Sequence, residues 1–138
     1  MTELGKFQFN PPNHATFWLQ GKIEQPQVER LFSQLAEAMA GQPYFFLTID
    51  LVDFKGDTPE ARRHSSDRFK ELPPRAVAII ADSFVQRTMA KLLFTAIELL
   101  AGDRRQYTKI LKREDPIEPW FESMIPTLEA AARELRQE

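Results

Sequence analysis

Three aspartates near the middle of the chain are the clearest candidates for chemistry. Asp50, Asp53 and Asp57 follow an apolar run at residues 44–49. Closely spaced carboxylates at the end of a buried strand are able to hold a hard cation such as Mg²⁺ or an aspartyl phosphate. A phosphate-receiving domain also needs an acidic pair after its first strand, and residues 9–11 and 20–21 supply none. Asp is common in turns and caps, so a loop of solvated carboxylates is the simpler interpretation.

Thr58 is the second candidate, because Pro59 and Glu60 follow it directly. This order is typical of a helix N-cap, a first-turn proline and a first-turn acid. The cap hydroxyl accepts a backbone N–H and contributes about 1 kcal/mol, which explains the residue fully. A phosphate on the same oxygen would instead lie at the positive end of the helix, with Arg62 and Arg63 one turn away. Both interpretations of Thr58 stay open.

The remaining residue types exclude several classes of site. There is no cysteine, which excludes thiol catalysis, disulfides and cysteine-based zinc sites. The five glycines form neither a dinucleotide fingerprint nor a phosphate loop, and no serine occupies a nucleophile elbow. His14 opens a predicted strand and His64 lies on a polar helix face, so both have structural explanations. The sequence therefore predicts a protein that is not an enzyme and has no cofactor or metal site.

Composition narrows the choice of partner. The 138 residues are 43% hydrophobic and 28% charged, which is typical of one globular domain. Eighteen Lys and Arg against 20 Asp and Glu give a formal charge of −2, which argues against a nucleic-acid partner. The N-terminus does not resemble a signal peptide, and no apolar run reaches the roughly 20 residues needed to span a membrane. We expect a cytoplasmic protein.

The first half of the chain is predicted to form a hairpin, a helix and a buried strand. Residues 6–9 and 14–20 alternate like strands around a turn at residues 10–13, and Gly21 marks the exit. Pro26 and Gly41 suit the first turn and the stop of a helix between them. The buried stripe of this helix consists of Val28, Leu31, Phe32, Leu35 and Met39. A strand at residues 44–49 follows, then an acidic loop at residues 50–57.

The second half alternates helices and strands. A helix runs from Thr58 to about residue 72, and residues 75–81 form the best candidate for a parallel strand. After a cap at residues 82–83, a helix at residues 84–100 has a predicted buried stripe of Val85, Met89, Leu92, Leu93, Ala96, Ile97 and Leu100. A strand at residues 107–111 and a helix from residue 116, with a break near Pro126, complete the chain. We expect one domain at residues 1–125 and a packed helical extension at residues 126–138.

Phe84 and Phe94 lie away from that stripe, beside Arg87 and Lys91. They either pack against a neighbouring helix or form an apolar contact for a partner or a second copy on a charged face. Surface aromatics that occur singly are normal, which favours packing within the molecule.

Together these elements predict a single-domain α/β fold. The sheet is mixed, mostly parallel and five-stranded, with an N-terminal antiparallel hairpin and about four helices. Ile49, Ile80 and Ile110 are expected side by side in parallel strands. Because ligands bind beyond the carboxyl ends of such strands, residues 50–58, 81–84 and 112–114 are the places to look for a site.

The order of elements resembles the STAS domain. The resemblance rests on the strand that ends at Asp50, the polar segment that enters a helix at Thr58, and the strand and long helix at residues 75–100. More narrowly, the chain resembles the uncharacterised bacterial SpoIIAA-like branch of anti-sigma-factor-antagonist-like proteins, whose fold is likened to the lipid-binding CRAL-TRIO domain. The resemblance extends from Gly5 to about Met124.

This resemblance implies a non-enzymatic regulatory or protein-interaction module. STAS antagonists carry a phosphorylatable serine or threonine after an aspartate, a position that falls on Asp57 and Thr58, although Pro59 departs from the family pattern. The candidate interaction residues are Asp53, Lys55, Asp57, Arg62 and Arg63 in the polar loop and Phe84, Arg87, Lys91 and Phe94 on the long helix at residues 84–100. Self-association through that helix or the hairpin is a further option. The alternative is a binder of a small apolar ligand or lipid between sheet and helices, as the CRAL-TRIO likeness implies.

Overall fold

Strands and helices alternate along the chain after an opening hairpin. The computed structural model describes the backbone of residues 5–101 and 105–137, with every side chain in these ranges except those of residues 52, 93 and 96–101. The elements in these ranges are β1 (Gly5–Asn10), β2 (His14–Ile23), α1 (Gln25–Ala38), β3 (Phe45–Asp57), α2 (Pro59–Lys70), β4 (Arg75–Ile80), α3 (Phe84–Ala101), β5 (Gln106–Leu111) and α4 (Glu118–Arg136).

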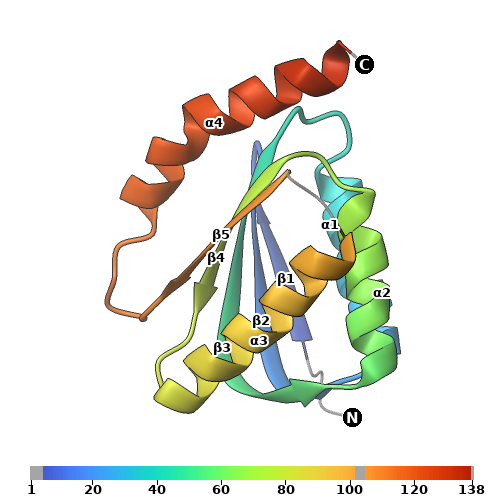
Figure 1. Cartoon of the computed structure of the whole chain (residues 1–138), viewed down its shortest axis with the longest axis vertical. Helices are drawn as coiled ribbons and strands as arrows, with labels where there is room; N and C mark the ends of the chain where they lie inside the picture. The colour runs from blue at the N-terminus through green and yellow to red at the C-terminus, as the bar shows by residue number, and fades with distance from the viewer. Residues whose placement is uncertain (1–4, 102–104, 138) are drawn as a thin grey trace.

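The strands form one sheet in the order β1-β2-β3-β4-β5 (Figure 1). The β1–β2 hairpin is antiparallel, and the other neighbouring pairs are parallel. Ile49 pairs with Ile79, and Ile79 pairs with Ile110, so the three predicted strands are adjacent and parallel, with Ile79 in the place expected for Ile80. The predicted fold class, a mixed five-stranded α/β sheet, is confirmed.

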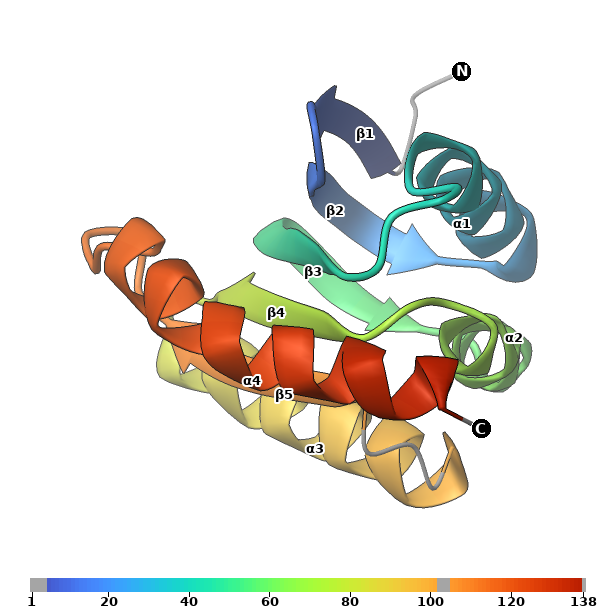
Figure 2. The same ribbon diagram turned by 90° about the horizontal axis from the view of Figure 1, so that it is seen from above.

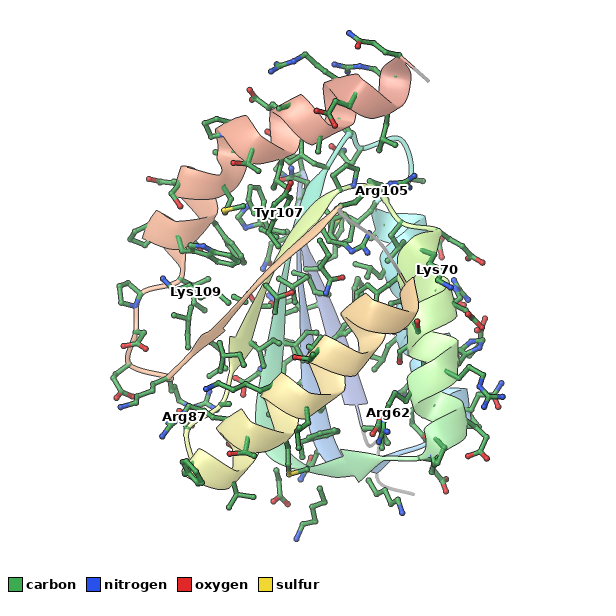
Figure 3. All side chains as sticks on the ribbon, viewed as in Figure 1. Arg62, Lys70, Arg87, Arg105, Tyr107 and Lys109 are labelled. Carbon is green, nitrogen blue, oxygen red and sulfur yellow. The ribbon has the colours of Figure 1, made fainter. Side chains whose placement is uncertain are left out.

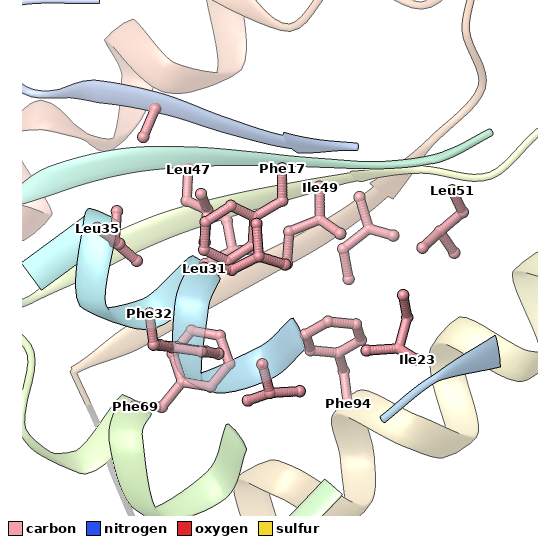
Figure 4. Packing of buried hydrophobic residues seen from close by; sticks show 14 of the residues in the cluster. Phe17, Ile23, Leu31, Phe32, Leu35, Leu47, Ile49, Leu51, Phe69 and Phe94 are labelled. Atoms are coloured by element: carbon pink, nitrogen blue, oxygen red, sulfur yellow. The ribbon is translucent and has the colours of Figure 1, made fainter. Parts of the chain in front are cut away.

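Helices cover both faces of this sheet. Side chains of α1, α2 and α3 pack with Leu47 and Ile49 on one face (Figure 4). On the other face, Phe121 and Leu128 of α4 pack with Phe46, and Figure 2 shows α4 on the side of β4 and β5, away from α1. Because alternate residues of a strand point to opposite faces, the central strands need apolar residues at nearly every position. All six residues of β4 are accordingly buried.

The predicted stripe of α1 is the buried face of that helix. Its five apolar residues, Val28, Leu31, Phe32, Leu35 and Met39, are all in the core. Pro26 lies in the first turn, where its missing N–H leaves no helical bond unmade. Gly41 follows the helix with φ +82°, a backbone conformation that favours glycine. The helix and its stop are confirmed.

The predicted loop at residues 50–57 is wrong, because β3 continues to Asp57. Its partner β2 also runs past Gly21, the expected exit, to Ile23. Gly21 has φ +71°, and the register shifts on both sides of it, so the two strands bend together and continue to pair. Leu51 and Phe54 of the extended strand are buried. The periodicity of the sequence indicated the apolar part of β3 and missed this polar continuation.

The predicted buried face of α3 is wrong in part. Val85 and Leu92 are 64% and 70% exposed, whereas Ala90 and Phe94 are 0% and 6% exposed. Apolar residues surround much of this helix, so periodicity alone did not decide which side meets the sheet. Figure 4 shows Phe94 in the core beside Ile23. Four members of the predicted stripe lie outside the described side chains: Leu93, Ala96, Ile97 and Leu100.

The predicted break at Pro126 is also wrong. α4 is one helix from Glu118 to Arg136 with Pro126 inside it. Phe121 before the proline and Leu128 after it are both buried against the sheet. Packing on both sides of the proline offsets the loss of one backbone hydrogen bond.

Candidate functional site

The carboxyl ends of β4 and β5 lie beside Asp50, which is inside β3 and not at its end, and Arg113 connects these three strands. Its Nη1 and Nη2 donate to the two carboxylate oxygens of Asp50 at 2.7 and 2.8 Å. Its Nε donates to Asp82 at 3.0 Å, and its backbone N–H donates to the same carboxylate at 2.8 Å. Asp50 is only 6% exposed. Sequence reasoning pointed to residues 112–114 but not to this role of Arg113.

The charges of this cluster satisfy one another. The hydrogen bonds that Arg113 donates to Asp50, and next those that it donates to Asp82, raise the pKa of its guanidinium. The backbone N–H of Arg113 is the largest cause of the lowered pKa of Asp82. Because the guanidinium pairs with both Asp50 and Asp82, it stabilises this part of the sheet and is not free to bind an anion.

Two of the three aspartates at residues 50–57 are paired with arginines. Asp50 is bound to Arg113, and Asp57 is bound to Arg62. No group of three His, Asp or Glu side chains could hold a metal ion in the part of the chain that the structure describes. These pairings do not support a cation held by Asp50, Asp53 and Asp57.

Thr58 is the N-cap of α2, as predicted. Its Oγ1 accepts a hydrogen bond from the backbone N–H of Ala61 at 3.1 Å, and its backbone is extended, with φ −78° and ψ 156°. Its own backbone N–H donates to the carbonyl of Ile23, which fixes the start of the helix to the end of β2. The half-buried hydroxyl is thus held at the positive end of α2.

The structure brings only part of the predicted polar loop together. Arg62 Nη2 donates to Asp57 Oδ1 at 3.0 Å across the cap, with side-chain exposures of 42% and 11%. Asp53 and Lys55 are exposed along the end of β3, and Arg63 is exposed on α2. The cluster that forms at the cap therefore consists of Asp57, Thr58 and Arg62.

A cavity of about 290 Å³ opens next to this cluster, between the end of β3, α2 and α3. It is lined by Phe54, Gly56, Asp57, Arg62, Met89 and Leu92. Gly56 has φ +109°, and a side chain on it would approach the Met89 methyl group at 3.9 Å. Sequence reasoning missed this cavity; the glycine between two charged residues was the one available signal.

An exposed apolar stripe runs along α3. Phe84, Val85 and Leu92 are 74%, 64% and 70% exposed. Lys91 beside them is exposed, and Arg87 donates to the backbone carbonyl of Asp82 at 3.1 Å. We call these three apolar residues with Arg87 and Lys91 the α3 surface. Phe94, predicted to belong to it, is buried and does not, which is a correction to the candidate interaction helix.

A second cavity lies inside the core on the same side of the sheet. Its volume is about 50 Å³, and its walls are almost entirely apolar, among them Phe17, Phe32, Ile49 and Phe69. Binding sites for small molecules usually have volumes of ~300–1,000 Å³. This space is too small for an acyl chain.

A polar cluster joins α1 to α2 on the outer surface. Glu29 pairs with His64 and accepts hydrogen bonds from Ser33 at 3.0 Å and from Arg68 at 2.9 Å. The hydrogen bond from His64, then those from Ser33 and Arg68, lower the pKa of Glu29 to about 2. His64 thus has the structural role predicted for it.

Comparison with known proteins decides the fold. No protein-family model matches the chain, and no curated protein matches its sequence. Among solved structures, the chain is similar to an uncharacterised DUF3478-family protein from Shewanella loihica PV-4, which has a SpoIIAA-like fold. The TM-score is 0.59 at 17% sequence identity, over 85% of this chain and 91% of the other. The chain has a SpoIIAA-like fold.

The SpoIIAA-like fold was predicted from the order of elements and is confirmed. Its kinship with CRAL-TRIO domains stays a prediction. A fold alone does not assign an activity, so the function has to be argued from surfaces and sites. No helix in the described part of the chain is long and apolar enough to cross a membrane.

Proposed function

We propose that this protein is a non-enzymatic interaction module whose α3 surface binds an acidic amphipathic helix of another protein. The observation that carries the proposal is the exposure of Phe84, Val85 and Leu92 on one helix. Exposed apolar residues that cluster, rimmed by charge, are typical of interaction sites.

The charge around this stripe favours an acidic partner. Lys91 is exposed next to Leu92, and the described residues give it no carboxylate partner. Lys55 and Arg63 are exposed on the neighbouring β3 and α2. These cations stand out on a chain whose formal charge is −2. An acidic helix with one apolar face would complement both the stripe and its rim.

Thr58 suits the role of a switch for this surface. A phosphate on Oγ1 would add about −1.5 to −2 charges at the start of α2, in competition with the Asp57–Arg62 pair. It would also place negative charge near the basic rim, where an acidic partner binds. We therefore expect Thr58→Asp to weaken partner binding more than Thr58→Ser does. Equal binding by the two variants would rule out the switch, but it would not contradict partner binding at the α3 surface.

The surface itself is tested by crosslinking and binding. A photo-crosslinking amino acid placed at Leu92 should trap a partner in the producing cells, whereas one placed at exposed Gln34 on α1 should not. The trapped protein, once purified, should bind Leu92→Asp at least about tenfold more weakly than the wild type, and Gln34→Asp about equally. The proposal fails if both positions trap the same proteins or if Leu92→Asp binds as the wild type does.

A further inference from the structure

β1 forms one edge of the sheet, and its outer side has no neighbouring strand among the described residues. The strand order is β1-β2-β3-β4-β5, and Figure 2 shows β1 as the outermost strand, at the end opposite to β5. An edge strand presents a row of backbone N–H and C=O groups with which another strand is able to pair. The register of the hairpin decides which residues of β1 carry these groups.

The backbone groups of Phe7 and Phe9 point away from β2. The N–H of Phe46 donates to the carbonyl of Asn13 at 2.9 Å, so the odd-numbered residues at the start of β2 bond to β3. The even-numbered residues of β2 therefore bond to β1, where they pair with the even-numbered residues of that strand. The odd-numbered residues of β1 are left for the outer side.

The open part of this edge is short. At one end, Arg30 Nη2 donates to the carbonyl of Gly5 at 2.6 Å, which confirms the outward direction of the odd-numbered residues and occupies this acceptor. At the other end, Pro11 has no N–H. Between them, no hydrogen bond from the described residues reaches the outer backbone groups of Phe7 and Phe9. The edge therefore offers two residues to a partner strand.

A second copy of β1 fits this short edge. Antiparallel pairing centred on Gln8 places Phe7 opposite Phe9 of the second copy, so each outward N–H finds a carbonyl. Both phenylalanines are half-buried on the face that α1 covers, and aromatic residues directly opposite each other stabilise a strand pair. On the other face Lys6 lies opposite Asn10 of the second copy, so no like charges meet.

The position of α1 permits this pairing. α1 meets β1 at Gly5, where Arg30 donates its hydrogen bond and where a side chain on the glycine would approach Leu31 at 3.0 Å. In an antiparallel pair, the Gly5 end of one copy lies beside the Pro11 end of the other. The two copies of α1 therefore lie towards opposite ends of the joined strands.

The opposite edge strand, β5, is less suited to such pairing. Lys109, which Figure 3 shows with Tyr107 on this strand, is exposed within β5. A lysine within an edge strand is one of the ways in which proteins prevent pairing with another chain. The centre of the pairing at β1 is instead the uncharged Gln8.

We propose that two copies of this chain join through β1 and form one continuous sheet with twofold symmetry. Phe7 and Phe9 of each copy supply the backbone hydrogen bonds, and Gln8 faces Gln8 of the second copy at the twofold axis. Because the interface is short, the dimer is weak and exchanges with the monomer. The edge of β1 shares no residue with the α3 surface, so the dimer does not depend on the proposed function.

Sedimentation velocity of the full chain over a range of concentrations tests the proposal. We expect a monomer–dimer equilibrium with a Kd below about 1 mM. Gln8→Lys places two like charges opposite each other and should weaken the dimer at least about tenfold. Gln20→Lys adds the same charge at an exposed position of β2 and should dimerise as the wild type does. The proposal is overturned if the wild type stays monomeric at about 1 mM, or if the two variants dimerise equally.

Crosslinking tests the twofold axis. The chain has no cysteine, so a single introduced cysteine reports only on the same position in the second copy. Directly opposite residues of a non-hydrogen-bonded antiparallel pair have Cα atoms about 4.5 Å apart, which suits a disulfide. Under mild oxidation Gln8→Cys should therefore form a linked dimer, whereas Gln20→Cys should stay monomeric. Linkage of Gln8→Cys no faster than that of Gln20→Cys would overturn the proposal.

Two further variants test the register. Lys6→Cys and Asn10→Cys should each stay unlinked alone, because the two copies of either position lie roughly 14 Å apart along the joined strands. A mixture of the two variants should form the mixed disulfide, since Lys6 lies opposite Asn10 of the second copy. Linkage of either variant alone as fast as that of the mixture would overturn the proposed pairing.

Discussion

Arg113 is the residue on which the carboxyl edge of the sheet depends. Its guanidinium pairs with a nearly buried carboxylate, Asp50 within β3, and with a second carboxylate, Asp82, just after the end of β4. Arg113 itself is half exposed, with a side-chain exposure of 52%. The interaction therefore contributes to the free energy of unfolding mainly because it gives the buried Asp50 carboxylate a partner.

Replacing Arg113 should therefore destabilise the fold. Arg113→Met leaves Asp50 buried and unpaired, so we expect the free energy of unfolding to fall by about 2 kcal/mol, measured by urea denaturation at pH 7. Lys112→Met, at an exposed neighbour, should change it by less than about 0.5 kcal/mol. Adding Asp50→Asn to Arg113→Met should restore part of the loss. A double variant less stable than Arg113→Met alone would contradict this account.

At the scale of elements, we expect the contact between α1 and α2 to depend on pH. The pKa of Glu29 falls from 4.5 to about 2, first through the hydrogen bond with His64 and then through those with Ser33 and Arg68. Because the folded-state pKa lies below the unfolded-state value, this group stabilises the fold above about pH 4.5. The contribution is lost as the pH falls towards 2.

Glu29→Gln should remove this pH dependence. The difference in unfolding free energy between wild type and variant should be largest near pH 5 and should shrink steadily as the pH approaches 2. Chemical denaturation at a series of pH values measures it. Glu37→Gln, at an exposed position on the same helix, is the control. A difference that is constant between pH 5 and pH 2 would show that Glu29 does not titrate through this cluster.

Substitutions on the buried and the exposed side of α3 should have very different effects on stability. Phe94 fills the core, so Phe94→Ala should lower the free energy of unfolding by about 3–5 kcal/mol. Leu92 is 70% exposed, so Leu92→Asp should change it by less than about 0.5 kcal/mol. Thermal and urea unfolding of both variants provide the measurement. A large loss in Leu92→Asp would mean that the predicted stripe, and not the observed one, faces the sheet.

For the whole molecule, an element could be predicted from the sequence wherever its pattern of apolar and polar residues fits only one structure. The stripe of α1, the cap at Thr58 and the strand β4 were all predictable, because only one side of α1 is apolar and β4 is apolar after Arg75. The polar end of β3 was not predictable, since its ladder depends on a bend at Gly21 in another strand. The cavity beside Arg62 was not predictable either, since it depends on how α3 packs against β3 and α2.

The extent of the domain depends on α4. We predicted a domain at residues 1–125 with a packed extension, and α4 crosses that boundary as one helix. Leu128, beyond the boundary, is fully buried against Phe46 and the rest of that face of the sheet.

A chain that ends at Ile125 should therefore be much less stable than the whole protein, because it exposes the sheet face that the second half of α4 covers. Leu128→Ala in the full chain should lower the unfolding free energy by about 3 kcal/mol, and the melting temperature by roughly 10 °C. Glu122→Ala, on the exposed side of the same helix, should leave both nearly unchanged. Calorimetry of the full chain and of these three variants measures this. If the truncated chain melts cooperatively at the temperature of the full chain, residues 126–138 are dispensable and the first 125 residues fold on their own.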